Sequence, residues 1–324
     1  MMKKKYLFPL FCFLSLVLAP PLLAQQKTII RFGHFPNVTH AQGVIAHALS
    51  RQGKGWFEQR LGPKIELQWF TYNAGPSAME AIFAGSLDLT YVGPNPALNA
   101  HFKSNGAEIR VLSGGANGGA ALVVGSKSGI EKPADLRGKK IATPQFGNTQ
   151  DISCRAWLKA QGFKVTMTGG DVSVIPTANP DQLALLQSGG VDAVWTIEPW
   201  VTRLLREANA RTLVDETNVI TTWLVSSTKF WQEKRELAGK IAAANAELTQ
   251  WIKANEAEAQ KLFIAELKAE TRADLAPDVV AQAWKRMTFT SDVSPDLVRK
   301  AVEDAKATGF AKGSTDTSAL LKTP

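Results

Sequence analysis

Cysteine is scarce in this sequence: only two of the 324 residues are cysteines. Cys12 lies in an N-terminal stretch that we expect to be removed, which leaves Cys154 alone. An intramolecular disulfide is therefore excluded, and the fold must be stable through its hydrophobic cores. A chain of this length can form two domains of ordinary size, each with a core of its own.

Signatures of catalysis and of nucleic-acid binding are also missing. The sequence contains no nucleophile elbow, phosphate-binding loop or metalloprotease motif, and the glycines of GGANGG lack the spacing of dinucleotide-binding loops. No stripe of Lys and Arg interleaved with aromatic residues is present, which argues against a nucleic-acid partner. We therefore expect no enzyme activity and no cofactor.

The N-terminal stretch, MMKKKYLFPLFCFLSLVLAPPLLAQQ, has the pattern of a secretory signal peptide. Three lysines precede a short apolar run that ends in LLA, with Ala24 before a polar residue. A membrane anchor is the alternative, but the run is short for a bilayer and is interrupted by Pro9. Cys12 does not follow the small residue of a lipoprotein cleavage site. We expect residues 1–24 to be removed on export and the mature protein to be soluble.

Removal of residues 1–24 takes away three lysines and no acidic residue. The net charge then falls from +8 to +5, with 34 basic and 29 acidic residues left. A mildly basic protein of this kind suits small anions, which its field helps to attract.

A pattern of strand, small polar turn and amphipathic helix recurs six times between residues 28 and 210. This alternation indicates parallel sheets covered by helices, so the fold class is α/β. In such sheets ligands bind beyond the carboxyl ends of the strands, where the helices begin. Because helix N-termini present free backbone N–H groups, several turns around one crevice would bind an anion. The six turns are PNVTHAQ, AGPS, PNPA, PQFGNTQD, ANPD and EPW.

The turn PQFGNTQD, residues 144–151, is the richest of these in small polar side chains. Gly147 allows the backbone to approach a ligand closely. Asn148 or Thr149 can cap the following helix, and Asp151 complements the helix dipole. The remaining amide and hydroxyl groups are left for solvent or a ligand, and the alternative is that all of them serve only as caps.

Two regions depart from the alternation. The glycine-rich stretch SGGANGGAALVV, residues 113–124, indicates a loop that crosses between lobes or binds a ligand. After Asn209 the alternation ends. Residues 219–227 predict one more strand, and the sequence from Lys229 onward predicts mostly helix.

Four segments resemble the periplasmic substrate-binding proteins of ABC importers for aliphatic sulfonates, taurine and nitrate: GHFPNVTHA, AIFAGSLDLTYVGPNPALNA, ADLRGKKIATPQFGNTQD and LALLQSGGVDAVWTIEPW. The likeness covers most of residues 28–230. It implies a type II periplasmic-binding-protein fold, a Venus flytrap with two lobes, each a mostly parallel sheet covered by helices. Lobe 1 would comprise residues 25–118 and 221–324, and lobe 2 would comprise residues 119–220.

The resemblance also implies which residues contact a ligand. They are expected on the turns already singled out, at the crossing between the lobes and at WTIEPW, and Trp223 is added because it is expected at a strand end. These residues are Pro36, Asn37, Thr39, His40, Gly75, Ser77, Gly93, Pro94, Asn95, Gly114, Gln145, Phe146, Asn148, Thr149, Gln150, Trp195, Glu198, Trp200 and Trp223.

The aromatic and acidic members of this set need particular roles. Core packing is the usual role of tryptophan, but Trp195, Trp200 and Trp223 are expected at strand ends. There they would contact an alkyl or aryl group beside the anion. Glu198 is unfavourable next to an anion, so we expect it to order a neighbouring loop or to pair with the cationic end of a zwitterion such as taurine.

Three histidines, His34, His40 and His47, raise the question of a metal site. Their spacing matches no short zinc pattern, and the sequence shows no carboxylate partner near them. His40 and His47 would lie about two turns apart on one helix, too far for simple chelation. We predict no metal site and a neutral His40 that donates a hydrogen bond to the ligand.

The function implied by the resemblance is capture of a small oxyanion, above all an aliphatic sulfonate or taurine, and its delivery to an ABC permease in the inner membrane. The protein would be a periplasmic monomer. Three alternatives stay open: a different solute such as nitrate or a phosphonate, a solute sensor that docks to a membrane receptor, and an exported enzyme. A similar fold serves enzymes of pyrimidine biosynthesis, but the cysteine-rich signature expected of them is missing.

Overall fold

The computed structural model describes residue 2 and residues 27–322, so nearly all of the expected signal peptide lies outside the described residues. The described chain forms eleven strands: β1 (Thr28–His34), β2 (Ile65–Thr71), β3 (Leu89–Val92), β4 (Ile109–Gly118), β5 (Ala120–Val124), β6 (Lys140–Thr143), β7 (Ser173–Pro176), β8 (Ala193–Ile197), β9 (Arg211–Glu216), β10 (Ile220–Ser227) and β11 (Met287–Phe289).

Twelve α-helices and two short 3-10 helices complete the described elements. They are η1 (Val38–His40), α1 (Ala41–Arg51), α2 (Trp56–Leu61), α3 (Gly75–Phe83), α4 (Pro94–Lys103), η2 (Pro133–Leu136), α5 (Thr149–Ala160), α6 (Asn179–Gln187), α7 (Trp200–Glu207), α8 (Thr228–Glu233), α9 (Arg235–Ala254), α10 (Glu256–Thr271), α11 (Pro277–Trp284) and α12 (Pro295–Thr308).

The strands form two mixed sheets, with the orders β11-β4-β10-β3-β1-β2 and β7-β6-β8-β5-β9. In the first sheet β1 pairs in parallel with β2 and β3, whereas β10 is antiparallel to β3 and β4. In the second sheet β6 pairs in parallel with β7 and β8, whereas β5 is antiparallel to β8 and β9. The sheets are therefore mixed, because β10 and β11 run against the other strands of the first sheet and β5 runs against those of the second.

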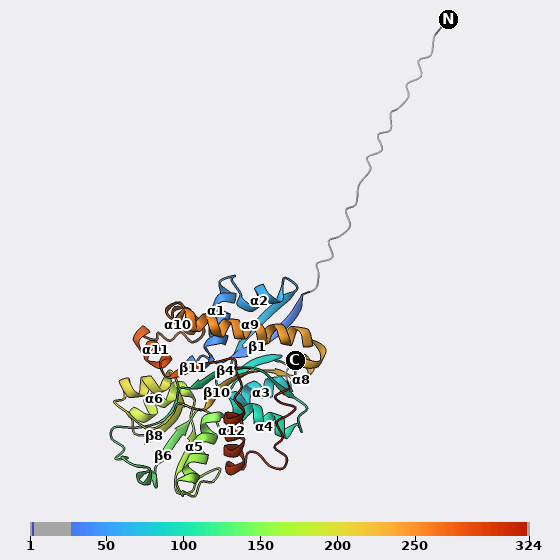
Figure 1. The fold of residues 1–324 in the computed structure, drawn as a ribbon. Coiled ribbons are helices and arrows are strands. Elements are labelled where there is room, and N and C mark those ends of the chain that lie inside the picture. Colours follow the sequence, from blue (N-terminus) through green and yellow to red (C-terminus); the bar gives the residue numbers. More distant parts are fainter. Residues whose placement is uncertain (1, 3–26, 323–324) are drawn as a thin grey trace.

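Helices cover both faces of each sheet, and a hydrophobic cluster fills each of the four layers between them. On one face of the six-stranded sheet, side chains of α1, α9 and α10 pack together, and on the other face those of α3, α4 and α12 do so. In the five-stranded sheet α5 covers one face, and α6 and α7 cover the other. Helices from the two ends of the chain meet on this sheet: α1 and α2 from the N-terminal part lie beside α9 and α10 from the C-terminal part (Figure 1).

The two sheets take their strands from different parts of the chain. Strands of the six-stranded sheet come from residues 28–118 and 220–289, and those of the five-stranded sheet from residues 120–216. We call the parts built on these sheets lobe 1 and lobe 2. Helix α12 contacts both α4 and α5, so its assignment to lobe 1, like the lobe boundaries themselves, stays a prediction.

Two neighbouring connections join the lobes. The first passes through Gly118 and Gly119, whose φ angles of 76° and 73° favour glycine. The second runs from β9 to β10, and the Gly118 N–H donates to the carbonyl oxygen of Val219 at 2.9 Å. Residues 113–124 connect the two sheets, as the crossing prediction had it, but they are not a loop, because they form the end of β4 and all of β5 with a break only at Gly119.

Besides β4 and β5, two further strands were not expected from the sequence. β9 follows Asn209, where the strand-helix alternation seemed to end, and it pairs with β5 at the edge of its sheet. β11 has only three residues and pairs with β4. Both are edge strands whose pairing partners lie far away in the sequence, so the local pattern gives little sign of them.

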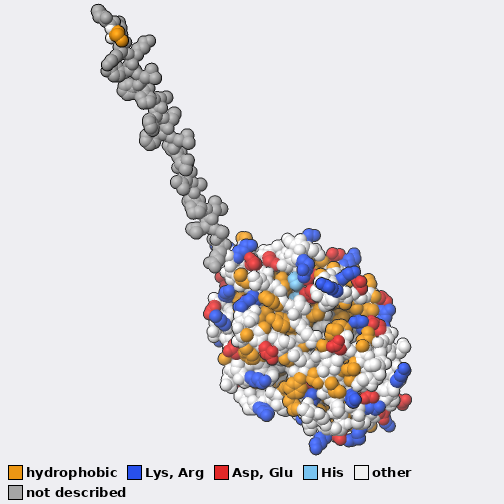
Figure 2. Space-filling view, turned by 180° about the vertical axis from the view of Figure 1, so that it is seen from behind, with side chains coloured by type: hydrophobic (Ala, Val, Ile, Leu, Met, Phe, Trp, Pro, Cys, Tyr) orange, Lys and Arg blue, Asp and Glu red, His pale blue; other side chains and the backbone are white. Residues whose placement is uncertain are grey.

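Among the residues that the structure describes, no helix is both long and apolar enough to span a bilayer. Figure 2 shows that Lys, Arg, Asp and Glu side chains are dispersed over the visible face, with hydrophobic patches between them. Basic side chains form no continuous stripe on that face.

Candidate functional site

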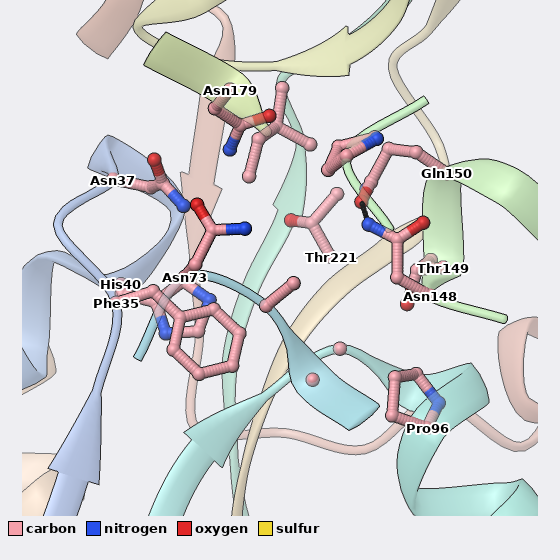
Figure 3. A pocket seen from close by; sticks show the side chains of 15 residues that line it. Phe35, Asn37, His40, Asn73, Pro96, Asn148, Thr149, Gln150, Asn179 and Thr221 are labelled. Atoms are coloured by element: carbon pink, nitrogen blue, oxygen red, sulfur yellow. Dashed lines mark hydrogen bonds between the residues drawn. The ribbon is translucent and has the colours of Figure 1, made fainter. Parts of the chain in front are cut away.

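A small cavity lies between the two sheets, at the ends of the strands where helices begin (Figure 3). Its volume of about 20 Å³ is slightly more than a single water molecule needs, so the lobes are close together around it. Both lobes contribute to its wall. The lining residues are Phe35, Asn37, His40, Asn73, Ala74, Gly75, Gly93, Pro96 and Thr221 from lobe 1 and its crossing strand, with Pro144, Asn148, Thr149, Gln150, Asn179 and Ile197 from lobe 2.

Five helices start at the wall of this cavity. The lining residues include the N-cap or first residue of α1, α3, α4, α5 and α6, in that order His40, Gly75, Gly93, Asn148 and Asn179. The first turn of a helix carries backbone N–H groups without partners inside the helix, and the helix dipole places a partial positive charge there. The cavity wall is therefore electropositive although it contains no cationic side chain.

Neutral polar side chains line the cavity, and no Lys, Arg, Asp or Glu is among the described residues of its wall. His40 is neutral as well, because burial, together with the nearby His34, holds its pKa well below the ordinary value of 6.5. A ligand here meets amides, hydroxyls and a neutral imidazole. The site can thus bind an anion without placing a full positive charge against it.

Several buried polar atoms at the cavity have no hydrogen-bond partner within the described protein. They include the Thr149 hydroxyl and Nδ1 of His40, both on lining residues, and the hydroxyl of neighbouring Thr39. An unpaired buried polar atom is costly, so natural proteins rarely leave one unless a water or ligand completes it. These atoms are ready hydrogen-bonding groups for a bound solute.

The turn before α5 is held by a buried network that fixes its lining residues. The Asn148 side chain caps the helix by accepting from the Asp151 N–H at 2.8 Å. Asp151 in turn accepts from the Gly147 N–H at 2.9 Å and from the Thr143 hydroxyl at 3.1 Å, and it pairs with Arg155 at 3.0 Å. Of the two caps that the sequence allowed, the structure shows Asn148. The Thr149 hydroxyl therefore remains without a partner within the described protein.

Direct contacts join the two lobes beside the cavity. The Trp200 indole N–H donates to the Asn37 side-chain oxygen at 2.9 Å, and the Val38 N–H donates to the Glu198 carbonyl oxygen at 3.2 Å. Ser77 donates to the Gln145 side-chain oxygen at 3.4 Å. Each of these bonds links a turn of lobe 1 to a turn of lobe 2, so all of them belong to the closed arrangement.

Glu198 is buried at the junction of the lobes and does not line the cavity. Its carboxylate contacts Arg286 at 2.7 Å and accepts from the N–H and the hydroxyl of Thr202. Burial raises its pKa from 4.5 to about 7, and the bonds from Thr202 and the charge of Arg286 only partly oppose this. Of the two roles expected for Glu198, the structure shows the ordering of a neighbouring segment. Its ion pair with Arg286 links lobe 2 to the segment before β11.

The structure brings about a third of the predicted contact residues to the cavity wall. These are Asn37, His40, Gly75, Gly93, Asn148, Thr149 and Gln150. Ser77, Gln145 and Trp200 form the contacts between the lobes described above. Pro36, Thr39, Pro94 and Asn95 belong to the same turns but are not in the wall, and the Asn95 amide donates to Ala301 instead. Whether any of them touches a ligand stays a prediction.

Two predicted aromatic contacts need correction. Trp195 lies in the middle of β8 and Trp223 within β10, not at strand ends, and both side chains are 1% exposed inside hydrophobic clusters. The Trp195 N–H donates to Glu216 at 2.9 Å, and neither residue is in the cavity wall. Both tryptophans therefore act in the cores of the lobes, because strand register decides which face a residue takes.

Phe146 and Gly114 also lie away from the cavity wall. Phe146 is 40% exposed and packs against Phe310 at 5.1 Å between ring centroids. Gly114 is inside β4, where an added methyl group would lie 2.3 Å from the carbonyl oxygen of Asp292. The close approach of the Asp292 backbone explains why position 114 is glycine, so no ligand contact is needed to explain it.

Sequence reasoning missed eight residues of the wall. They are Phe35, Asn73, Ala74, Pro96, Pro144, Asn179, Ile197 and Thr221. Four of them, Ala74, Pro96, Pro144 and Asn179, sit in turns that the repeated pattern had already marked, and Phe35, Asn73 and Ile197 directly precede such turns. Thr221 is different, because it reaches the cavity from the crossing strand β10, and its position follows only from the packing of the lobes.

The histidines also require a correction. His34 and His47 contact a carboxylate after all, because Glu270 of α10 lies 2.9 Å from a ring nitrogen of each. Glu270 is more than 200 residues away in the chain, so no sequence spacing could have shown it. His40 lies apart from this cluster, in the cavity wall.

Comparisons with known proteins agree with this geometry. The chain is 29% identical over 205 residues to the taurine-binding periplasmic protein of Escherichia coli, a match that covers 63% of this chain and 60% of that protein. It is also 29% identical over 185 residues to a putative aliphatic sulfonates-binding protein of Escherichia coli, covering 56% of this chain and 55% of that protein. The match therefore spans less than two thirds of each relative, and both are named as binding proteins rather than enzymes.

Among solved structures, the fold is similar to that of the alkanesulfonate-binding protein SsuA from Xanthomonas axonopodis pv. citri bound to MOPS. The TM-score is 0.74 at 21% identity, over 93% of this chain and 100% of that chain. This likeness establishes the periplasmic-binding-protein fold. Residues 23–266 match the NMT1-like family, so the chain belongs to that family.

Proposed function

We propose that this protein is the solute-binding component of an ABC import system, which captures an aliphatic sulfonate or taurine between its lobes and delivers it to a permease in the inner membrane. The observation that carries the proposal is the convergence of five helix N-termini on a cavity whose wall has no charged side chain. A sulfonate offers three oxygens that accept hydrogen bonds, and the cavity offers donors. The sulfonate and taurine relatives support this choice of ligand.

The energetics fit reversible capture. A micromolar dissociation constant requires about 8 kcal/mol, and hydrogen bonds to a charged group contribute roughly 1.5–3 kcal/mol each. A few such bonds, from backbone N–H groups and from the Thr149 hydroxyl, supply this after the cost of ordering the lobes. Because no fixed cation faces the anion, its release to a permease does not require a salt bridge to break.

Capture would proceed by closure of the lobes. A cavity of about 20 Å³ is too small for a sulfonate or taurine, so binding needs an open arrangement in which the bonds from Trp200 to Asn37 and from Ser77 to Gln145 are broken. The paired glycines at the crossing, Gly118 and Gly119, are where the backbone can turn. Closure then presents surfaces of both lobes to the permease.

A thermal-shift screen tests the proposal, because a ligand that binds only the folded protein raises its melting temperature. The purified protein is heated with alkanesulfonates, taurine, an aryl sulfonate, nitrate and a phosphonate, and with choline as a cationic control. We expect stabilisation by a sulfonate and none by choline. Stabilisation by choline alone, or by none of the oxyanions, would contradict the anion site.

Two further measurements separate the competing classes. Long incubation of the best ligand with the protein, followed by chemical analysis, should recover it unchanged, whereas turnover above a control without protein would indicate an enzyme. Isolation of the membrane partner distinguishes a permease from a receptor. A receptor would leave ligand binding intact and would assign the protein to solute sensing.

A second candidate ligand is nitrate, and the small volume of the cavity favours it. A sulfonate carries an alkyl chain in addition to its charged group, so its cavity must be larger than the one seen here. Nitrate is planar and needs less space. If nitrate stabilises the protein and sulfonates do not, the ligand assignment changes while the anion mechanism remains.

A further inference from the structure

A cluster of ligating side chains lies in lobe 1, outside the cavity. His34 from the end of β1, His47 from α1 and Glu270 from α10 bring three ligand atoms together. Nε2 of His34 and Nδ1 of His47 are 3.1 Å apart, and each is 2.9 Å from Oε1 of Glu270. The three side chains come from three separate elements and converge on one point.

We propose that these three residues form a binding site for a divalent transition-metal ion, with Zn²⁺ as the best match. Two imidazoles and a carboxylate are a common ligand set for zinc, with bonds of about 2.0–2.2 Å. Ligand atoms at such distances are roughly 2.9 Å apart at right angles and roughly 3.3 Å apart at the tetrahedral angle. The observed separations of 2.9 to 3.1 Å lie within that range, so an ion could sit roughly 1 Å above the triangle.

The carboxylate of Glu270 gives independent support. Its side chain is only 4% exposed, and Oε1 accepts from Thr71 at 3.1 Å in addition to contacting both histidines. The second oxygen, Oε2, is buried and has no hydrogen-bond partner within the described protein. All the hydrogen bonds of this carboxylate therefore go to Oε1, and Oε2 is left as a buried, unpaired anionic oxygen. A cation bound by both oxygens would give Oε2 a partner.

The surrounding charges suit a divalent ion. Glu266, one turn before Glu270 on α10, lies 3.1 Å from Nδ1 of His47 and offers a fourth ligand. Two carboxylates balance the two charges of the ion. Arg51 pairs with Glu266 at 2.8 Å and also faces His47, but its side chain is 52% exposed and can turn to solvent.

The site has support around it and a route of entry. The Trp69 ring stacks on His47 with 5.2 Å between centroids and meets the edge of the His34 ring, which fixes both orientations. The His34 side chain is fully buried, whereas that of His47 is 15% exposed, so an ion can enter from that side. A bound ion would join α10 to β1 and α1, the unit that also carries Asn37 and His40.

Metal titration of the purified protein without an affinity tag tests the proposal. After treatment with EDTA and dialysis, Zn²⁺ is added under calorimetry, and Co²⁺ is added in a separate experiment to record its visible spectrum. We expect one equivalent of Zn²⁺ to bind, to raise the melting temperature, and to give Co²⁺ bands of a low-coordinate nitrogen and oxygen site.

Three variants test whether the ion binds at this cluster. Glu270→Gln and His47→Gln should each weaken Zn²⁺ binding by more than about tenfold. His101→Gln, which alters a part-buried histidine that bonds to Asp316 in another part of lobe 1, should bind as wild type does. Melting curves without metal show that each variant is folded. Absence of saturable Zn²⁺ uptake by the wild type, or unchanged uptake by either cluster variant, would overturn the proposal.

Discussion

Gly93 and Thr149 face each other across the cavity, and a methyl group added to Gly93 would lie 2.2 Å from the Thr149 hydroxyl oxygen. Gly93 precedes α4 in lobe 1, and Thr149 begins α5 in lobe 2. The backbone at Gly93 has a φ of −65°, which any residue adopts. The glycine is therefore required for the approach of the two lobes and not for the conformation of the turn.

This relationship predicts that Gly93→Ala prevents full closure. We expect the dissociation constant for the best oxyanion to rise at least tenfold, a loss of about 1.4 kcal/mol or more, while the melting temperature without ligand changes little. Calorimetry and melting curves measure the two effects. Gly169→Ala is the matched control, because an added methyl group there has no neighbour within 4 Å.

The double variant Gly93→Ala with Thr149→Ala makes this test more specific. Removing the Thr149 hydroxyl takes away the atom at 2.2 Å and leaves the nearest side-chain carbon at 3.2 Å. Small-angle scattering with ligand should show closure regained in the double variant. If the single variant closes as readily as wild type, the two lobes do not meet at these residues in solution.

A second prediction concerns the free hydroxyl at the start of α5. Thr149→Val keeps the shape of the side chain but removes a hydroxyl that has no partner within the described protein. Loss of one charge-assisted hydrogen bond costs about 1.5–3 kcal/mol of binding free energy, with an unchanged melting temperature. In contrast, Thr143→Val removes a bond to Asp151 and should lower stability more than affinity. Equal affinity of Thr149→Val and wild type would show that the hydroxyl does not touch the ligand.

Gln145 and Thr39 provide a third prediction, one from each lobe. Gln145→Ala removes the bond from Ser77, which exists only when the lobes meet, and should cost about 0.5–1.5 kcal/mol of binding free energy. Thr39→Ala removes an unpaired buried hydroxyl and should also weaken binding. Asn148→Ala should additionally lower stability by about 1 kcal/mol, because Asn148 caps α5. If Gln145→Ala and Thr39→Ala both bind the ligand as wild type does, those turns only begin helices and do not contribute to ligand binding.

The fourth prediction is a pH dependence of stability from Glu198. Its pKa rises from 4.5 to about 7 in the folded protein, so between these values the folded state binds more protons at Glu198 than the unfolded chain does. The stability contributed by this group is therefore present at low pH and lost as the pH rises toward 7. Glu198→Gln cannot titrate, so we expect it to gain about 1–3 kcal/mol relative to wild type between about pH 5 and about pH 8.

Urea unfolding of both proteins at several pH values measures this difference. Glu207→Gln serves as the control, because Glu207 is a partly exposed carboxylate paired with Arg203 on the same helix. A difference between Glu198→Gln and wild type that stays constant with pH would show that Glu198 is already ionised throughout.

The fifth prediction concerns export. If residues 1–24 are a cleaved signal peptide, mass spectrometry of the protein isolated from its native host should show an N-terminus close to Gln25. The reason is the short apolar run between Lys5 and Ala24. An intact Met1 on the native protein would contradict cleavage.

The helix starts around the cavity could be predicted from sequence because their signals are local. Asn148 and Thr149 were the two candidate caps of α5 in the sequence, and the structure shows that Asn148 is the cap. In the same way, proline in the first turn marks the starts of α3, α4 and α6. An anion site formed by these turns was thus within reach of sequence reasoning.

Other parts of the site depend on long-range packing and could not be predicted. Trp195 and Trp223 have suitable chemistry for an alkyl group, but strand pairing turns both into the cores. Thr221 reaches the cavity only because β10 crosses between the lobes, and Glu270 meets His34 only because α10 packs on α1. No spacing along the chain encodes these contacts.

The two connections between the lobes, at Gly118–Gly119 and between β9 and β10, lie next to each other. Asn117 at the end of β4 is a direct neighbour of Ile220 at the start of β10, so the chain leaves lobe 1 and returns to it at adjacent points. The five-stranded sheet is therefore built from one uninterrupted segment of the chain, and exchange of that segment would leave the strand order of the six-stranded sheet intact. Such an exchange would replace six residues of the cavity wall in one step: Pro144, Asn148, Thr149, Gln150, Asn179 and Ile197.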